Sequence, residues 1–469
     1  MFAGILLIFN IIFLCVALYF MIESLREKEA RAPYFGLAGA IFHFILIPII
    51  IWVPVFRIPI LILFCLYVLA LIIFSIPGTK SPMVLEGSIG HVKGEVTRFD
   101  ERDTVFARTE AKFAHAEELH EAYYKKHPEY KEYDENERKH GIWSRPPGTI
   151  DNHYGPYLAM MGPSEQVMYG LGEHAVEEPS PDAGENPLSL ENATEMVKKY
   201  ALHIGADLVG ICEVNELWSY THRGAEYFDM ANYGKEIPPP MPYALMFAVE
   251  MSYDHVSTAP HTPTMVESFH QYARGIIISN AIAKWFSGMG YNARAQHVVH
   301  YDTLMVPLAV DSGLGELGRQ GYLIAPKYGC RVRVFGVTTD MPLIPDKPIS
   351  LGADTFCNKC KKCATSCPSR AIPLEDKVIH NGVKKWKVND HACYNFWGKV
   401  GTDCAICMSI CPFSRPDRPI HRLVRWMVGR SSLAQHLFPY IDNLIYGKKW
   451  RPKKLVSWLD IQVESKEVY

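Results

Sequence analysis

The residues best suited to chemistry are cysteines, and eight of the 12 in this 469-residue chain fall between Cys357 and Cys411. The first run reads Cys-x2-Cys-x2-Cys-x3-Cys-Pro, and the second set ends in Cys-x2-Cys-x3-Cys-Pro. Such spacing wraps successive thiolates around one 4Fe–4S cube, and in two-cluster ferredoxins the fourth cysteine of a run ligates the other cluster. The pattern predicts two clusters: cluster 1 on Cys357, Cys360, Cys363 and Cys411, and cluster 2 on Cys367, Cys393, Cys404 and Cys407.

Clustered cysteines can also form disulfides or bind structural zinc. A disulfide scaffold would spread its cysteines through a small secreted domain. Structural zinc also binds CxxC pairs, but usually two well-separated pairs and not a triple run followed by x3-Cys-Pro. The sequence therefore favours two iron–sulfur clusters, which pass single electrons between a donor and a deeper site.

Three apolar stretches precede the soluble part of the chain, at residues 2–22, 34–56 and 58–77. Each approaches or exceeds the roughly 20 residues that cross a bilayer core as a helix. A cleaved signal peptide is disfavoured because two more apolar stretches follow and no basic segment precedes the first. The sequence therefore predicts a membrane anchor of three helices.

Lysine and arginine in the flanking loops predict how this anchor is oriented. Residues 26–31 and 80–98 each hold three of them, whereas Arg57 stands alone between the second and third stretches. Because basic loops favour the cytoplasmic side, we expect a multi-pass protein of the inner (cytoplasmic) membrane. Its N-terminus would face outward and its catalytic part would face the cytoplasm.

The overall charge is nearly balanced, at −2 for the whole chain, which argues against a general nucleic-acid binder. Residues 415–454 are an exception, with ten lysines or arginines and two acids. We interpret this segment as contacting the anionic inner leaflet. The alternative is an ordinary solvated face or a support for the ligand site.

The soluble part alternates predicted helices with predicted strands, which favours an α/β sheet. Helical periodicity marks residues 109–138, 189–204 and 266–289, and apolar strands are expected at 205–211, 244–249 and 332–338. The proposed divisions are a membrane anchor at 1–80, a helical lead-in at 81–187, a catalytic core at 188–350, a ferredoxin-like segment at 351–415 and a basic cover at 416–469.

A glycine-rich stretch lies within the predicted core. Glycines without Cβ atoms allow the backbone to approach a bulky ligand closely, and their amides can bind phosphate or amide groups. A purely structural turn is the alternative, and the pattern is not a dinucleotide-binding G-x-G-x-x-G because its strand and acid are misplaced. The candidate ligand-binding residues are Gly313, Gly315, Gly318 and Gly321.

Several motifs occur in a specific order over residues 188–447. Gly205-Ala-Asp-Leu-Val-Gly-Ile, the glycine-rich stretch and Val337-Thr-Thr-Asp-Met-Pro-Leu precede the two cysteine motifs. This order resembles the corrinoid-dependent reductive dehalogenases, and the epoxyqueuosine reductases share part of it. The resemblance implies an α+β or α/β fold: a nitroreductase-like core around a base-off cobalamin, beside a two-cluster ferredoxin-like segment.

The resemblance also implies a tyrosine that donates a proton, with a basic residue nearby. Tyr272, which the pattern puts at the opening of the long helix, is the candidate donor, and Arg331 or Arg333 is the candidate base. A phenol is protonated at neutral pH, and a neighbouring guanidinium stabilises its anion. Only one of the two arginines is expected to lie in the pocket, and the choice between them stays open. His297 and His300 could supply a third polar group near the cofactor.

The resemblance predicts that electrons flow through both clusters to cobalamin. It also predicts that the enzyme removes halide from a small organohalide. The electron donor is unspecified, a quinol or another reduced carrier. No Asp-x-His-x-x-Gly motif supplies a lower cobalt ligand, so we interpret His153 and His255 as packing or surface residues and His43 as incidental. The rival hypotheses are a membrane-tethered electron carrier without corrinoid and an epoxyqueuosine-type reductase acting on tRNA.

Overall fold

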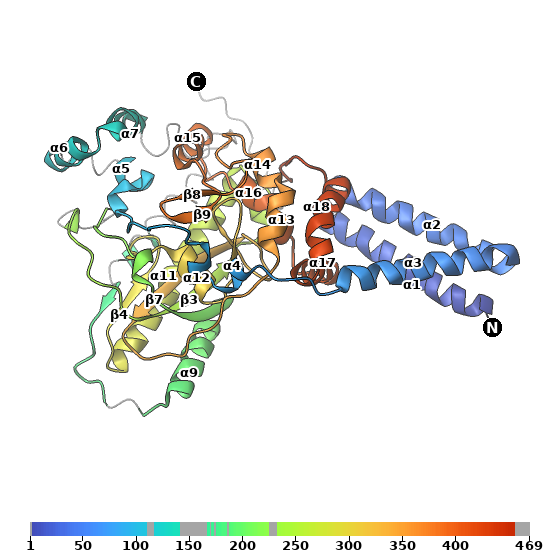
Figure 1. Cartoon of the computed structure of the whole chain (residues 1–469), viewed down its shortest axis with the longest axis horizontal. Helices are drawn as coiled ribbons and strands as arrows, with labels where there is room; N and C mark the ends of the chain where they lie inside the picture. The colour runs from blue at the N-terminus through green and yellow to red at the C-terminus, as the bar shows by residue number, and fades with distance from the viewer. Residues whose placement is uncertain are drawn as a thin grey trace, which may run out of the picture.

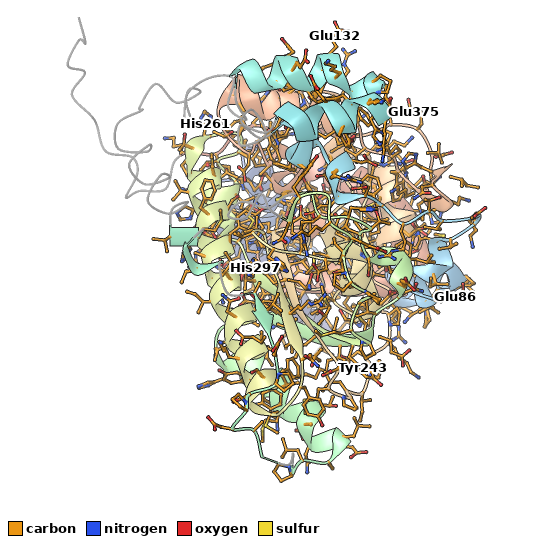
Figure 2. The ribbon with its side chains drawn as sticks, turned by 90° about the vertical axis from the view of Figure 1, so that its left-hand side faces the viewer. Glu86, Glu132, Tyr243, His261, His297 and Glu375 are labelled. Carbon is orange, nitrogen blue, oxygen red and sulfur yellow. The ribbon has the colours of Figure 1, made fainter. Side chains whose placement is uncertain are left out.

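The computed structural model describes residues 2–109, 117–140, 167–168, 170–172, 175–184, 187–224 and 232–454. The molecule is elongated, with a bundle of N-terminal helices at one end and a larger body of helices and strands at the other (Figure 1). Helices α17 (Pro419–Arg430) and α18 (Ser432–Tyr446) lie between the two parts and run across the end of the bundle.

The bundle consists of α1 (Phe2–Arg26), α2 (Ala32–Trp52) and α3 (Arg57–Ser75), which confirms the three expected apolar helices. All three are long and apolar enough to cross a membrane. Most of their side chains point outward, as expected of helices whose surroundings are lipid.

One polar pair is buried inside this bundle, and it corrects the interpretation of His43 as incidental. The Asn10 side-chain amide donates to the His43 carbonyl at 2.8 Å, and its oxygen lies 2.9 Å from His43 Nδ1. Phe13 stacks on the same imidazole, with ring centroids 5.6 Å apart. Hydrogen bonds of this kind join helices where water is absent, so His43 fixes α1 against α2.

The lead-in contains short helices: α4 (Pro82–Leu85), α5 (Val105–Thr109), α6 (Glu117–Lys126) and α7 (Pro128–His140). The single helix expected over residues 109–138 is therefore divided. Pro128 cannot continue a preceding helix, because it lacks an N–H and crowds the turn before it. His153 lies outside the described residues.

The core sheet has five strands in the order β1-β4-β7-β3-β2, and every neighbouring pair is antiparallel. The mixture of helices and strands is as expected from the sequence, which left the strand directions open. The strands are β1 (Val176–Glu177), β2 (Leu208–Glu213), β3 (Tyr243–Glu250), β4 (Ala293–Gln296) and β7 (Val332–Thr339).

Both faces of the central strands are buried. Leu245, Phe247 and Val249 of β3 pack towards α9 (Leu190–His203) and α11 (Thr262–Gly288). The alternate residues of β3 pack towards α12 (Met305–Asp311) instead. This period of two explains why the strand reads as a continuous apolar run.

Helix α11 starts earlier than expected. It begins at Thr262, with Pro263 in its first turn, so Tyr272 lies well inside the helix and does not open it. Helix α9 begins as expected, since the Ser189 side chain accepts a hydrogen bond from the Asn192 amide.

The cysteine-rich segment follows the core as short elements joined by loops. These are α13 (Ala353–Cys360), α14 (Lys362–Ser366), β8 (Val378–His380), β9 (Val383–Lys385), α15 (Asp390–Val400) and α16 (Ile406–Ser409). The segment packs between the sheet and the helices α17 and α18, so it lies between the core and the membrane bundle (Figure 1).

Candidate functional site

The eight clustered cysteines lie as two groups. Cys357, Cys360 and Cys363 come from α13 and α14, and Cys411, which follows α16, is close enough to affect their electrostatics. Cys367 and Cys393 are in turn near Cys404 and Cys407. These are the two sets that the spacing pairs, so the thiols are placed to hold one cube each.

Among the residues described, no three His, Cys, Asp or Glu side chains converge on a point that could hold one metal ion. The ligands of a mononuclear zinc site converge on a single ion at about 2.0–2.3 Å. A 4Fe–4S cube is bound differently, because each of its four irons takes one ligand.

A cavity of about 560 Å³ lies between the sheet and the cysteine-rich segment. This is within the range of small-molecule sites, about 300–1,000 Å³. Its walls are mainly apolar and aromatic, with polar groups at a few points. The core contributes Trp218, Tyr220, Tyr272, His297, Met305 and Phe335, and the cysteine-rich segment contributes Lys385, Trp386 and Val388.

This cavity adjoins the pocket lined by the four cysteines assigned to cluster 2, and Val388 lines both. Tyr322 also lines the cluster pocket, is partly buried, and lies close enough to Cys407 and Tyr272 for both to influence its pKa. Burial, reinforced by Cys407, raises that pKa well above its usual value. A cofactor in the large cavity would therefore lie beside cluster 2.

Tyr272 lines the cavity, and Arg333 lies behind it. The Arg333 guanidinium carbon is 4.6 Å from the centre of the Tyr272 ring. Arg333 Nη2 also donates to Ser268 Oγ at 2.5 Å and pairs with Asp403 at 3.1 Å. Burial alone would lower the pKa of Arg333, but Tyr272 and Asp403 raise it, so this arginine stays charged.

Arg331 lies elsewhere. It is 1% exposed, and its guanidinium donates to the backbone carbonyls of Ser414 and Met251 and pairs with Glu250 at 3.0 Å. Residues two apart on a strand share a face, but β7 starts at Val332, so Arg331 precedes the strand and only Arg333 belongs to it. Of the two arginines that the sequence left open, Arg333 is the one beside Tyr272.

His297 lines the cavity, whereas His300 does not. The His300 amide donates to His297 Nδ1 at 3.3 Å, which leaves the hydrogen of the neutral ring on Nε2. Burial, with His300 nearby, lowers the pKa of His297 to about 3, so the ring is neutral. His297 Nε2 is buried and has no hydrogen-bond partner among the described residues. It is free to donate to a ligand.

Of the four candidate glycines, only Gly321 lines the cavity, with a φ of +83°. Packing of the protein itself explains two others. A Cβ at Gly313 would lie 2.7 Å from the Lys347 carbonyl oxygen, and one at Gly315 would lie 2.2 Å from that of Ile324. Gly318 is crowded by the Gln320 side chain. The alternative hypothesis, that these glycines serve a purely structural turn, therefore explains most of this stretch.

Sequence reasoning missed two residues of the site, Asp403 and Ser268. They hold Arg333 from two different elements, and the Ser268 hydroxyl also bonds to Asp403. The position of Asp403, directly before Cys404, was the only available signal. No sequence signal connects Ser268 to Arg333, because helix α11 and strand β7 meet only in the folded chain.

Several known proteins are similar to this chain in sequence. Residues 356–414 match the family model of the 4Fe-4S dicluster domain. The tetrachloroethene reductive dehalogenase of Sulfurospirillum multivorans is 29% identical over 296 residues, covering 56% of this chain and 58% of that protein. An epoxyqueuosine reductase from Lactococcus garvieae is 22% identical over 156 residues, 32% of this chain and 42% of that one.

Solved structures of reductive dehalogenases are also similar to this chain. The catabolic reductive dehalogenase NpRdhA, in complex with 3-bromo-4-hydroxybenzoic acid, matches with a TM-score of 0.61 and 26% identity over 80% of this chain and 50% of that one. A reductive dehalogenase whose structure suggests a mechanism for B12-dependent dehalogenation matches with a TM-score of 0.54 and 28% identity, covering 62% and 42%. The chain spans about half the length of these relatives. It carries a 4Fe-4S dicluster domain and is homologous to the reductive dehalogenases.

Proposed function

We propose that this protein is a corrinoid-dependent reductive dehalogenase, in which electrons pass through two 4Fe–4S clusters to a cobalamin that faces a small organohalide. The observation that carries the proposal is the position of the cavity. It has Tyr272 in its wall and shares Val388 with the pocket of cluster 2. The homology to reductive dehalogenases supports it.

The residues around the cavity fit an organic cofactor that has apolar faces and polar groups at its edge. Its walls are apolar, and the unpartnered Nε2–H of His297 supplies a donor for an amide or carbonyl of the ligand. Lys385 and Lys387 lie on the opposite, cysteine-rich wall and could bind anionic groups. Burial, with Lys387 nearby, lowers the pKa of Lys385. When bound, cobalamin would supply the electrons for breaking the carbon–halogen bond.

The chain itself supplies the proton. The net reaction consumes two electrons and one proton, replaces a carbon–halogen bond by a carbon–hydrogen bond and releases halide. The Tyr272 hydroxyl donates the proton, and the Arg333 cation stabilises the resulting phenolate. Asp403 and Ser268 hold Arg333 against the ring and keep it from turning away. The apolar walls exclude water that would compete as a proton source.

Electrons enter from the membrane side. Lys362, between Cys360 and Cys363, pairs with Asp442 of α18. Asp442 also pairs with Arg415, which reaches Glu29 in the loop between α1 and α2. Cluster 1 thus lies towards the anchor and cluster 2 towards the cavity. We propose a membrane-borne donor such as a quinol, an inner-membrane location and a catalytic body on the cytoplasmic side.

The first test is the metal content of the full chain, produced in a host supplied with cobalamin and purified in detergent. The proposal requires one cobalt and, for two cubes, about eight irons per chain. In the same preparation, Tyr272→Phe should keep both metals and lower organohalide turnover by about 10²-fold or more, because the proton donor is lost.

The matched control is Tyr243→Phe, which removes a hydroxyl from the end of β3 outside the cavity lining and should leave turnover unchanged. Iron without cobalt, at full iron occupancy, would refute the dehalogenase proposal and leave an electron carrier. Turnover of a modified tRNA in place of organohalides would favour an epoxyqueuosine-type reductase.

A further inference from the structure

Helices α17 and α18 have two different faces. Their inner faces pack on the cysteine-rich segment through buried residues such as Met427, Val428 and Ala434. Their outer faces are also apolar, yet the described residues leave them uncovered. Leu423 and Trp426 of α17 are exposed, and so is a set spaced by three or four residues along α18: Leu433, Leu437, Tyr440, Ile441 and Leu444.

These two helices are fixed at the end of the membrane bundle and lie across it (Figure 1). The Gly78 amide donates to the Arg430 carbonyl at 2.8 Å, just after α3. Phe74 of α3 packs on Phe438 of α18, with ring centroids 4.9 Å apart. A helix that crosses the end of a spanning bundle lies in the plane of the membrane surface.

Basic side chains accompany this apolar face. Arg422 of α17 is exposed, and Lys448, Lys449 and Arg451 are exposed just after α18. In-plane membrane helices combine an apolar face with flanking lysine and arginine, which meet the acyl boundary and the anionic headgroups respectively.

We propose that α17 and α18 form an interfacial membrane-binding surface, made of the exposed apolar residues named above, which inserts into an anionic leaflet beside the spanning helices. The occupant is the lipid surface itself, because the surface continues directly from the spanning anchor. The inference rests on the proposed membrane anchor and is independent of the dehalogenase activity. It places cluster 1, whose ligands Cys357 and Cys360 lie on α13 against α18, next to the headgroups.

The test uses the full chain in nanodiscs of mixed zwitterionic and anionic phospholipid. A diazirine-bearing amino acid is incorporated at position 437 or 444, irradiated, and analysed for lipid adducts by mass spectrometry. Position 379, an isoleucine 62% exposed on β8 of the cysteine-rich segment, is the matched control for an exposed apolar residue. Position 44, a phenylalanine 67% exposed on α2, reports insertion of the anchor.

The expected result is lipid adducts at 437, 444 and 44, with a several-fold lower yield at 379. Adducts at 44 but not at 437 or 444 would contradict the proposed membrane-binding surface but would agree with the membrane anchor. Equal yields at 379 and 437 would also contradict that surface. Crosslinks between two protein chains at 437 would instead assign this face to a second copy. The absence of adducts at 44 would refute the anchor, and the surface with it.

Discussion

Gly275 on α11 faces the aromatic ring of Phe335 on β7, and this contact should not tolerate any side chain. A Cβ at Gly275 would lie 2.1 Å from Phe335 Cζ. Because carbon atoms pack at about 3.5–4.0 Å, the ring would have to move by about 1.5 Å. Phe335 is 1% exposed and stacks on Phe247 with centroids 5.5 Å apart, so the ring can move only by losing this stacking and entering the cavity that it lines.

Two opposing effects set the size of the change in Gly275→Ala. Alanine favours a helix over glycine by up to about 1 kcal/mol. Overpacking a buried site costs about 1–3 kcal/mol, and this rigid, fully buried ring should be near the upper end. We expect a net loss of about 1–2 kcal/mol, which lowers the unfolding midpoint of a domain of this size by about 3–6 °C.

The assay is thermal unfolding of the full chain in detergent, followed by tryptophan fluorescence. Gly288→Ala, at the end of the same helix, is the control, because a Cβ there has nothing within 4 Å. The double variant Gly275→Ala with Phe335→Leu should recover part of the loss, since the smaller side chain makes room. A Gly275→Ala midpoint equal to that of wild type would refute the packing argument.

Other predictions concern the site. Arg333→Met should lower turnover by about 10²-fold or more with little change in the unfolding midpoint, whereas Arg331→Met should mainly lower the midpoint, because Arg331 bonds buried carbonyls. The pKa of His297 is lowered to about 3 by burial, so only the unfolded chain binds this proton between about pH 6.5 and 3. Stability should fall as pH drops through that window, and His297→Asn should reduce the slope by up to about 1.4 kcal/mol per pH unit in denaturant titrations. Cys407→Ala should lose cluster 2 and about half of the iron, whereas Cys330→Ser should keep all of the iron. Iron analysis and EPR would measure both, and loss of iron in Cys330→Ser would contradict the assignment of cluster ligands.

The parts of this protein that depend on local sequence could be predicted from it. Ligand spacing within one loop limits which cysteines can share a cube. The 4Fe-4S dicluster segment could therefore be predicted from the sequence without knowledge of the fold. Long apolar runs specify helices wherever water is absent, which is why the three N-terminal helices agree with expectation within a few residues.

Other features depended on contacts between residues far apart in the chain. The antiparallel sheet was not evident, because a strand buried on both faces has the same apolar composition in either direction. The glycine-rich stretch indicated a ligand loop, but main-chain packing at Gly313 and Gly315 explains most of it. His43 looked isolated because its partner, Asn10, is on another helix.

The sequence by itself determined the chemistry that is available: eight thiolates in two sets, a candidate phenol at Tyr272 and an arginine on the following strand. Only the tertiary structure decided that Arg333 rather than Arg331 lies against Tyr272, and that Asp403 connects this pair to the loop of cluster 2. The physical reason is that Arg331 precedes β7 whereas Arg333 lies on it, and the packing of α11 and the cysteine-rich segment against β7 determines which arginine becomes part of the site.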